Sequence, residues 1–405
     1  MLITQIRNSL LTLFVIGFFF FPQLQTIIIA ACFVTLLVDK TYYDQFSIVL
    51  KNKLGLAMIG YFLVLAISVL YSQNVPEGLR SLETKLSFFV FPFFLPVVFH
   101  NRNITKRLLT VLLYAGVSYI LLSLIDAAIH YQSTRSISSF FYTELGVGFF
   151  RESSFVHPTY ASFFYNVLIA HVALGILQNE GDSKKKIRSI GVLILLVLFV
   201  FMLSSKFGIL ALFLNLCFLL FFYIKKTKQV AKAAVVLVLF TLGASFVVTQ
   251  TPLKHRFESA FSALTSSSGK YSSTQTRLDV WNVTAEVIAE HPILGVGTGD
   301  VRDELRMKYM ENEYFLYAER GYDSHQEFLQ TWAALGLLGV LLLLSLFYFL
   351  FHRAKQTRHF LLTIFTILFL LFGLVESMLE RQAGVVFFVF FGLLLHSYSP
   401  LKNNN

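Results

Sequence analysis

The chain has 405 residues, of which 56% are hydrophobic and only 14% are charged. A soluble domain carries about a quarter charged residues, so this composition excludes a soluble enzyme or binding module and indicates that lipid is the solvent. The formal net charge is +10. The basic residues are distributed as the topology of a membrane protein requires, so the charge does not indicate a nucleic-acid partner.

A transmembrane helix needs about 20 mostly apolar residues, and shorter ones are tolerated. The first apolar run follows Arg7 and lacks a small-residue cleavage site, so we interpret it as a retained span and not as a secretion signal. The first two runs are short and could instead be one long tilted helix. Pro92 and Pro96 predict kinks in the fourth run, which membranes tolerate. The sequence therefore predicts an all-α, polytopic transmembrane bundle of about twelve spans, at 9–22, 24–39, 54–71, 86–100, 107–130, 159–178, 189–204, 207–224, 233–249, 332–351, 359–376 and 383–398.

Basic residues in short loops mark the cytoplasmic side of a membrane protein. If the N-terminus is cytoplasmic, the segments on that side hold 19 of the 33 Lys and Arg residues. Basic and non-basic loops then alternate along the whole chain. This orientation predicts cytoplasmic termini, with the opposite loops outside the cytoplasm.

The same topology divides the chain into three parts. Residues 1–249 form the first nine spans, residues 250–331 a large loop outside the cytoplasm, and residues 332–405 the last three spans with a short cytoplasmic tail. Such a loop is too long for an idle connection. The other outward segments are residues 131–158 and short turns near 80–85, 205–206 and 376–381.

The large loop has three distinct stretches. Its lead-in, Ser262–Thr276, is rich in Ser and Thr. The next stretch, Arg277–Glu290, predicts an amphipathic helix that covers the membrane or the bundle, with its apolar face at Leu278, Trp281, Ala285 and Ile288. Gly295, Gly297 and Gly299 then precede Asp300, and we interpret them as a tight turn with positive φ angles. A phosphate-binding cradle is the alternative.

A histidine lies at the end of this loop, directly before the tenth span. Ser324 and Glu327 have the spacing of a capping box, with Ser324 as the N-cap. His325 would then be the first helical residue, and the helix dipole would keep it neutral near pH 7 and able to accept a hydroxyl proton. The alternative is an interfacial histidine that only begins a helix.

Cations at span ends on the same side form the second candidate feature: Arg80, Lys85, Lys206 and Arg381. Charges at membrane depth are costly and tend to be functional, although snorkelling is an alternative for any one of them. Together they suit an anionic lipid head group such as a diphosphate. Glu376 and Asp126 could pair with them. Cys32 and Cys217 lie in apolar runs, and no His/Cys cluster indicates a metal.

Four stretches of the chain are distinctive: Ser204-Ser-Lys-Phe-Gly-Ile-Leu-Ala-Leu; Arg277-Leu-Asp-Val-Trp with His291-Pro-Ile-Leu-Gly-Val-Gly-Thr-Gly; Ser324-His-Gln-Glu-Phe-Leu-Gln with Gly336 and Gly339; and Glu376-Ser-Met-Leu-Glu-Arg-Gln-Ala-Gly. They resemble the O-antigen ligase and polymerase superfamily of bacterial envelope glycosyltransferases. A further element, His157-Pro-Thr-Tyr160, resembles the family at the outer end of the sixth span, and the resemblance covers roughly residues 80–395. The resemblance implies a bacterial inner membrane, with the exported loops in the periplasm.

This resemblance implies a metal-independent, inverting transfer that needs no cofactor. The donor is a glycan on undecaprenyl diphosphate, and the acceptor is a hydroxyl of lipid A–core or of another glycan. By resemblance, His325 handles the acceptor and Arg277 holds the diphosphate. Lys206 stands where the family usually has arginine, which keeps the charge but loses the bidentate fork. Lys85 and Arg80 are further expected diphosphate contacts, and His157, Tyr160 and Arg381 are additional candidates.

Three other functions remain open at this stage. A polymerase would share the ligase motifs and differ in its acceptor; the late position of the large loop, beside the histidine, favours a ligase. A lipid or glycan transporter predicts charges within spans and internal repeats, whereas most ionisable residues here lie at span ends, Asp126 being the main exception. A purely structural protein would leave the large loop unexplained.

Overall fold

The structure is a computed structural model that describes residues 2–142, 157–178, 183–255, 257–258 and 273–398. Within these ranges the chain forms helices and turns and no strand, which confirms the all-α class. Most of the Ser/Thr-rich lead-in expected at 262–276, and the end of the cytoplasmic tail, lie outside the described residues. The chain divides into two compact units, one of residues 1–13, 26–108 and 270–405, the other of residues 14–25 and 109–269.

Seven helices of the described chain are long and apolar enough to cross a membrane, so the protein is a multi-pass membrane protein. An eighth span is added if the bent pair Pro22–Leu37 and Tyr42–Lys51, which meet at 84°, counts as one crossing. The seven are α1 (Leu2–Phe20), the joined α6 and α7 (Val75–Phe99), α8 (Arg102–Thr134), α9 (Pro158–Gln178), α11 (Lys206–Thr227), α12 (Val230–Gln250) and α17 (Glu327–Thr357).

The other predicted spans also fall on helices, although these are shorter or broken. A short 3-10 turn, Pro22–Leu24, separates α1 from α2, so the alternative of one long initial helix is wrong. Length and composition thus support seven or eight crossings of the twelve predicted. The remaining helices are α2 (Gln25–Leu37), α5 (Lys53–Val69), α10 (Ser183–Met202), α18 (Phe360–Gly373) and α19 (Gln382–Ser397).

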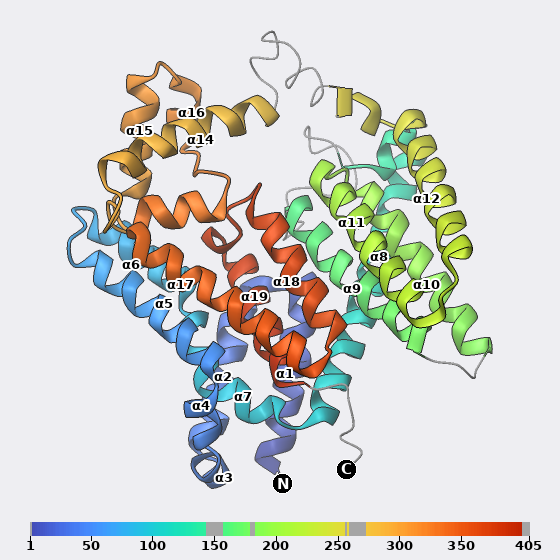
Figure 1. Ribbon diagram of the computed structural model, residues 1–405, viewed down its shortest axis with the longest axis horizontal. Helices are drawn as coiled ribbons and strands as arrows, with labels where there is room; N and C mark the ends of the chain where they lie inside the picture. The colour runs from blue at the N-terminus through green and yellow to red at the C-terminus, as the bar shows by residue number, and fades with distance from the viewer. Residues whose placement is uncertain (1, 143–156, 179–182, 256, 259–272, 399–405) are drawn as a thin grey trace. The chain divides into compact units, whose positions relative to one another are not determined.

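Helix α19 is the centre of the first unit. Its residues from Gly384 to Leu395 are all buried, and it packs against α7, α17 and α18. Figure 1 shows α19 among these helices. The Phe388 ring lies 4.2 Å from that of Phe369, in a cluster of buried phenylalanines. An all-round apolar helix of this kind is buried on every side.

The region that the sequence predicted as a turn near Arg80–Lys85 is helical instead. Helix α6 (Val75–Lys85) begins at Asn74, whose side chain accepts a hydrogen bond from the Glu77 amide at 3.2 Å. It leads into α7 (Ser87–Phe99), which contains Pro92 and Pro96 as expected. The Asn cap and Pro76 at the start favour the helix, and these signals precede the range we had assigned to the turn.

Helices α14 (Ser273–Glu290), α15 (Val301–Glu311) and α16 (Phe315–Arg320) form a polar layer beside the start of α17 (Figure 1). The predicted amphipathic helix is therefore present and packs on the bundle. Its buried face agrees with the predicted one only in part: Val280, Val283, Val287 and Ile288 are buried, whereas Ala285 is exposed. The predicted and the buried residues both have helical spacing, so only the partner helices decide between them.

The second unit contains most of α8, with α9, α10, α11 and α12. Helix α9 is almost entirely buried. The side-chain amide of Asn166 donates to the Gly208 carbonyl at 3.2 Å, and the backbone carbonyl of Asn166 accepts a hydrogen bond from the Asn215 side chain at 2.8 Å. A Cβ at Gly208 would overlap the Ser162 hydroxyl, so α9 and α11 approach closely through a small residue. Helix α12 exposes most of its apolar surface, as a helix in lipid does.

Candidate active site

Arg277, from α14, and Glu376, which follows α18, form the central ion pair of the candidate site. Nη2 of Arg277 lies 2.6 Å from Oε1 of Glu376, and its Nε donates to the Val375 carbonyl at 2.9 Å. Both side chains are largely shielded from solvent. Two directed bonds from one planar guanidinium fix the orientation of the segment that carries Glu376.

His325 lies against the other oxygen of the same carboxylate. Its Nδ1 is 3.5 Å from Oε2 of Glu376 and 3.4 Å from Oδ1 of Asp323. The Asp323 carboxylate also accepts the backbone N–H of His325 at 2.9 Å. Because carboxylates occupy the Nδ1 side, the ring can present Nε2 to a substrate, which is the arrangement of a histidine base oriented by an acid.

The predicted capping box is wrong. Helix α17 begins at Glu327, and its N-cap is Gln326, whose side chain accepts the Leu329 amide at 2.5 Å. Ser324 instead donates its hydroxyl to the Gln326 carbonyl at 2.8 Å. His325 therefore lies two residues before the helix, with a left-handed φ of 46°. A non-glycine residue in that region is held by its surroundings, and here the Asp323 bond to its amide does so.

The expectation of a neutral His325 is reversed for the same reason. Burial by itself lowers the pKa of His325, but the hydrogen bond to Glu376 and the charges of Asp323 and Glu376 outweigh it and raise the pKa above its ordinary value. Arg277 opposes this rise. Burial raises the pKa of Asp323, and the nearby histidine partly offsets that. The flanking carboxylates, which local sequence spacing does not reveal, account for the raised pKa of His325.

The short segment between α18 and α19 connects these residues to the helix start. The Ser377 hydroxyl donates to Oδ1 of Asp323 at 3.2 Å and accepts the Gln326 amide at 3.2 Å. Two residues on, the Leu379 amide donates to the buried Glu327 carboxylate at 2.7 Å. This segment, residues 375–381, therefore holds Arg277, His325 and the first turn of α17 in one network.

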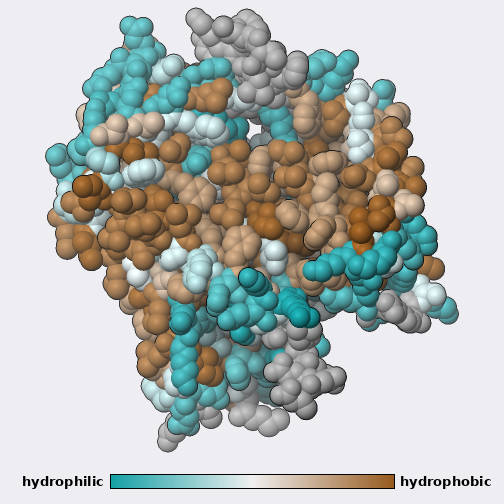
Figure 2. Space-filling model, viewed as in Figure 1, coloured by the Kyte–Doolittle hydropathy of each residue, from teal (hydrophilic) through white to brown (hydrophobic). Residues whose placement is uncertain are grey.

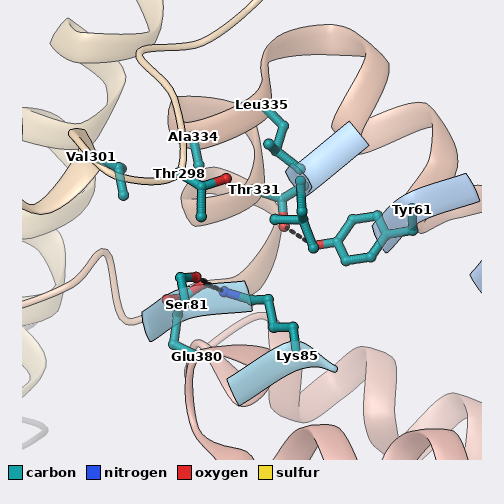
Figure 3. Close-up of a pocket in the computed structure, with 10 residues that line it drawn as sticks. Tyr61, Ser81, Lys85, Thr298, Val301, Thr331, Ala334, Leu335 and Glu380 are labelled. Atoms are coloured by element: carbon teal, nitrogen blue, oxygen red, sulfur yellow. Dashed lines mark hydrogen bonds and ion pairs between the residues drawn. The ribbon is translucent and has the colours of Figure 1, made fainter. Parts of the chain in front are cut away.

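Lys85 extends the network into a small pocket. Its Nζ lies 2.8 Å from Oε1 of Glu380 and 3.0 Å from the Ser81 hydroxyl, and its side chain is only 3% exposed. Figure 3 shows Lys85 and Glu380 on one wall of the pocket, with Tyr61 directed toward Thr331 from the other side. Lys85 thus lies near the candidate site as expected, but its charge is neutralised by an acid.

The two other predicted cations of this unit differ in environment. Arg80 is 73% exposed and pairs with Glu77, one turn earlier on α6, at 2.9 Å. Arg381 is exposed at the start of α19 and forms no ion pair with any residue that the structure describes. It follows Glu380 directly, so an accessible arginine lies beside the network.

The predicted residues Lys206, His157 and Tyr160 belong to the second unit. Lys206 is the first residue of α11, after the N-cap Ser205, whose hydroxyl accepts the Gly208 amide at 3.1 Å. His157 is exposed at the start of α9, and its ring lies edge-on to that of the buried Tyr160, 6.3 Å away. The structure thus describes these residues within their own unit.

The glycine-rich turn is structural, and the phosphate-cradle alternative is wrong. Gly295 and Gly297 have positive φ angles of 67° and 98°, as predicted. Amides throughout the turn are already donated: Gly297 to the Ala334 carbonyl at 2.9 Å, and Gly299 to the Ser72 hydroxyl at 3.1 Å. The Asp300 carboxylate accepts the amides of Gln73 and Asn74 at 2.8 and 2.7 Å. The turn thus bonds the polar layer of α14, α15 and α16 to the connection between α5 and α6. Its amides are already used in these bonds and do not form an anion site.

Sequence reasoning did not find the roles of Asp323, Ser377, Glu327 and Glu380. The first three surround His325 and its helix, and Glu380 pairs with Lys85. Glu376 pairs with Arg277, which is not one of the four span-end cations that we had expected as its partners. In the sequence, the two acids Glu376 and Glu380 within one short stretch that resembles the family could have indicated that this segment binds cations. Of the described residues, no three His, Cys, Asp or Glu gather as a metal site would require.

One family model matches the chain, over residues 191–344, and its description is O-Antigen ligase. Over these residues, which are less than half of the chain, the protein is similar to the O-antigen ligase family. The match contains Lys206, Arg277 and His325, whereas Lys85, Glu376 and Arg381 lie outside it. Members of this family are membrane glycosyltransferases of the ligase or polymerase type that use lipid-linked glycans in the bacterial envelope. No curated protein matches the chain.

Proposed function

We propose that the protein is an O-antigen ligase, which transfers a glycan from undecaprenyl diphosphate to a hydroxyl of lipid A–core. The family domain supports membrane glycan transfer in general. One observation supports a particular site: His325 and Arg277 share the carboxylate of Glu376. An imidazole that can accept a proton then lies beside a guanidinium, and both groups favour transfer from a lipid diphosphate.

The proposed site faces the periplasm. The alternation of basic and non-basic loops supports cytoplasmic termini and an exported segment at 250–331 in a bacterial inner membrane. In that orientation the polar layer of α14, α15 and α16 lies outside the cytoplasm, together with the segment 375–381. We therefore keep the division 1–249, 250–331 and 332–405 as the proposed topological domains.

The proposed reaction is one inverting displacement that needs no metal. The acceptor oxygen attacks the anomeric carbon of the donor sugar, and the bond from that carbon to the diphosphate oxygen breaks. The acceptor proton passes to Nε2 of His325, and the bonding electrons leave with undecaprenyl diphosphate. Arg277 stabilises the negative charge that develops on this leaving group. The acids at Nδ1 stabilise the imidazolium formed in the same step.

The remaining cations are proposed to hold the diphosphate to different extents. Arg381 is exposed beside the network and can reach an anion without breaking a described ion pair, and Arg80 is also accessible. Lys85 would contribute only if its pair with Glu380 opened. Lys206, and His157 with Tyr160, remain candidates on the family resemblance, since they belong to the other unit.

The test uses a bacterial strain that lacks this protein, complemented with single variants, and a gel of the envelope glycolipids. His325→Ala and Arg277→Ala should each abolish the glycan on lipid A–core, because loss of a general base or of charge stabilisation costs about 100-fold or more. Matched controls are His291→Ala, directly after α14, and Arg306→Ala, on α15; both side chains are exposed. Unchanged glycan in both site variants, at normal expression, would refute the site.

The strain without the protein separates ligase from polymerase. A ligase defect leaves complete polymer on the lipid carrier. A polymerase defect instead leaves lipid A–core that carries single repeats. The second pattern would replace the proposed acceptor with a growing glycan while keeping the same site.

A further inference from the structure

Helix α17 is broken at Gly336, nine residues after it begins. Gly336 has φ 63° and ψ −161°, a conformation outside any helix. A Cβ at this position would overlap the carbonyl oxygen of Ile293, so only glycine fits. A break in a membrane helix frees backbone groups that lipid cannot satisfy, and another part of the protein must therefore bond to them.

The segment that follows α14 supplies those bonds. The Val296 and Gly297 amides donate to the carbonyls of Ala333 and Ala334, each at 2.9 Å, and the Leu337 amide donates to the carbonyls of Pro292 and Ile293, each at 3.1 Å. In sequence terms the segment belongs to the large polar loop. In the structure it is joined to the interior of a span.

The carbonyls of residues 292–294 are all occupied. Pro292 accepts the Trp332 indole N–H at 3.0 Å as well as the Leu337 amide, and Leu294 accepts the Tyr71 hydroxyl at 2.8 Å. Tyr and Trp side chains that bond to polar groups in this way are typical of the boundary between lipid and water.

The side chains of the same segment point outward. Ile293 is 70% exposed and Leu294 is 63% exposed, although both are large and aliphatic. The apolar surface around them includes the exposed side chains Leu70, Leu337, Leu338 and Leu341. Figure 2 shows a continuous apolar band over α5 and α17, with hydrophilic side chains of the polar layer above it. Moving side chains of this size from water into an apolar environment is favourable.

We propose that residues 292–294 are a membrane wedge, with Ile293 and Leu294 inserted among the acyl chains of the adjoining leaflet. The remaining length of α17 fits this depth: from Leu337 to Thr357, at 1.5 Å per residue, it spans roughly 30 Å, the thickness of the hydrocarbon core. The wedge therefore lies at the edge of that core and continues the lipid-facing surface of α17.

The wedge also determines the height of the candidate site above the membrane. It follows directly on α14, which carries Arg277, and it is bonded to the first part of α17, which His325 precedes. Insertion of Ile293 and Leu294 thus holds both residues at the lipid surface, where the diphosphate of a lipid-linked substrate lies. The insertion itself does not depend on the reaction.

The experiment measures the accessibility of nitroxide spin labels in the full-length protein in phospholipid nanodiscs, after Cys32→Ala and Cys217→Ala. Labels at Ile293→Cys and Leu294→Cys are compared with Leu341→Cys as the lipid reference and Arg306→Cys as the water reference. We expect high accessibility to oxygen and low accessibility to a water-soluble nickel chelate, as at Leu341. Nickel accessibility equal to that at Arg306 would overturn the proposal. So would low accessibility to both reagents, which indicates a second protein chain over the segment.

A second measurement connects the wedge to activity. The double variant Ile293→Asp/Leu294→Asp should lose most glycan transfer, while Met307→Asp, an exposed apolar side chain on α15, should not. Full transfer by the double variant, at normal expression, would refute the role in positioning. If the unaltered protein transferred no glycan, the accessibility measurement would still decide whether the wedge inserts.

Discussion

Arg277 and Glu376 are 99 residues apart in the sequence, and their side chains meet at 2.6 Å. The opposite oxygen of the same carboxylate lies 3.5 Å from His325. One acid therefore links the guanidinium and the imidazole, so that a change at Glu376 must affect both. The predictions below begin with this link.

Glu376→Gln should shift the pH dependence of glycan transfer. The acids raise the pKa of His325 above the ordinary histidine value of about 6.5. The neutral ring, which accepts the proton, therefore becomes the main form only at a higher pH. Transfer should therefore fall as the pH is lowered through that raised pKa. Removing the Glu376 charge lowers the pKa, which moves the acidic limb of the rate profile to lower pH, and the maximal rate falls because Arg277 loses its anchor.

The matched control for this experiment is Glu319→Gln, an exposed acid on α16. Its profile should coincide with that of the unaltered protein. An acidic limb that stays in place in Glu376→Gln would show that His325 is not the group that titrates.

Arg277→Lys should reduce transfer by about tenfold or more, although the charge is kept. Lysine is a point donor and cannot replace both the bond to Glu376 and the bond to the Val375 carbonyl. The measurement is the initial rate with a lipid-linked glycan donor in nanodiscs. Arg306→Lys, on the exposed face of α15, should have an unchanged rate. Equal rates for the two variants would mean that the fork geometry of Arg277 is unimportant.

Lys85→Met should destabilise the protein, because it leaves Glu380 without its partner next to the buried Glu327. Breaking a buried ion pair costs about 3–5 kcal/mol, and the partial exposure of Glu380 places this case at the lower end. The double variant Lys85→Met/Glu380→Met should regain most of the loss, since two apolar side chains replace the pair. Unfolding midpoints in detergent measure both. A double variant no more stable than Lys85→Met would contradict this account.

Gly336→Ala should prevent normal folding, whereas Gly243→Ala should be tolerated. At Gly336 the new Cβ meets the Ile293 carbonyl and the φ angle is positive; at Gly243, in the middle of α12, nothing lies within 4 Å. Alanine in a helix interior is favoured over glycine by about 0.5–1 kcal/mol, so Gly243→Ala should be neutral or slightly stabilising. The yield of monodisperse protein and its thermal midpoint test both. Normal yield of Gly336→Ala would show that the break in α17 is dispensable.

The sequence alone determined the helical class, the position of the apolar segments and the residues with the reactive side chains. These follow from local properties: twenty apolar residues in succession need lipid, and charges near span ends mark its surface. Arg277 and His325 could be singled out by position and resemblance before any contact was known.

Only the tertiary structure decided how these residues act. The helix dipole and a capping box predicted a neutral His325 at the start of a helix, but Asp323 and Glu376 flank it and α17 begins at Glu327. Lys85 and Arg381 looked equivalent in the sequence, yet one is buried against an acid and the other is exposed. The Pro292–Leu294 segment looked like loop and is bonded to a broken span. In each case the deciding partner is distant in the sequence, and electrostatic and packing energies depend on distance in space.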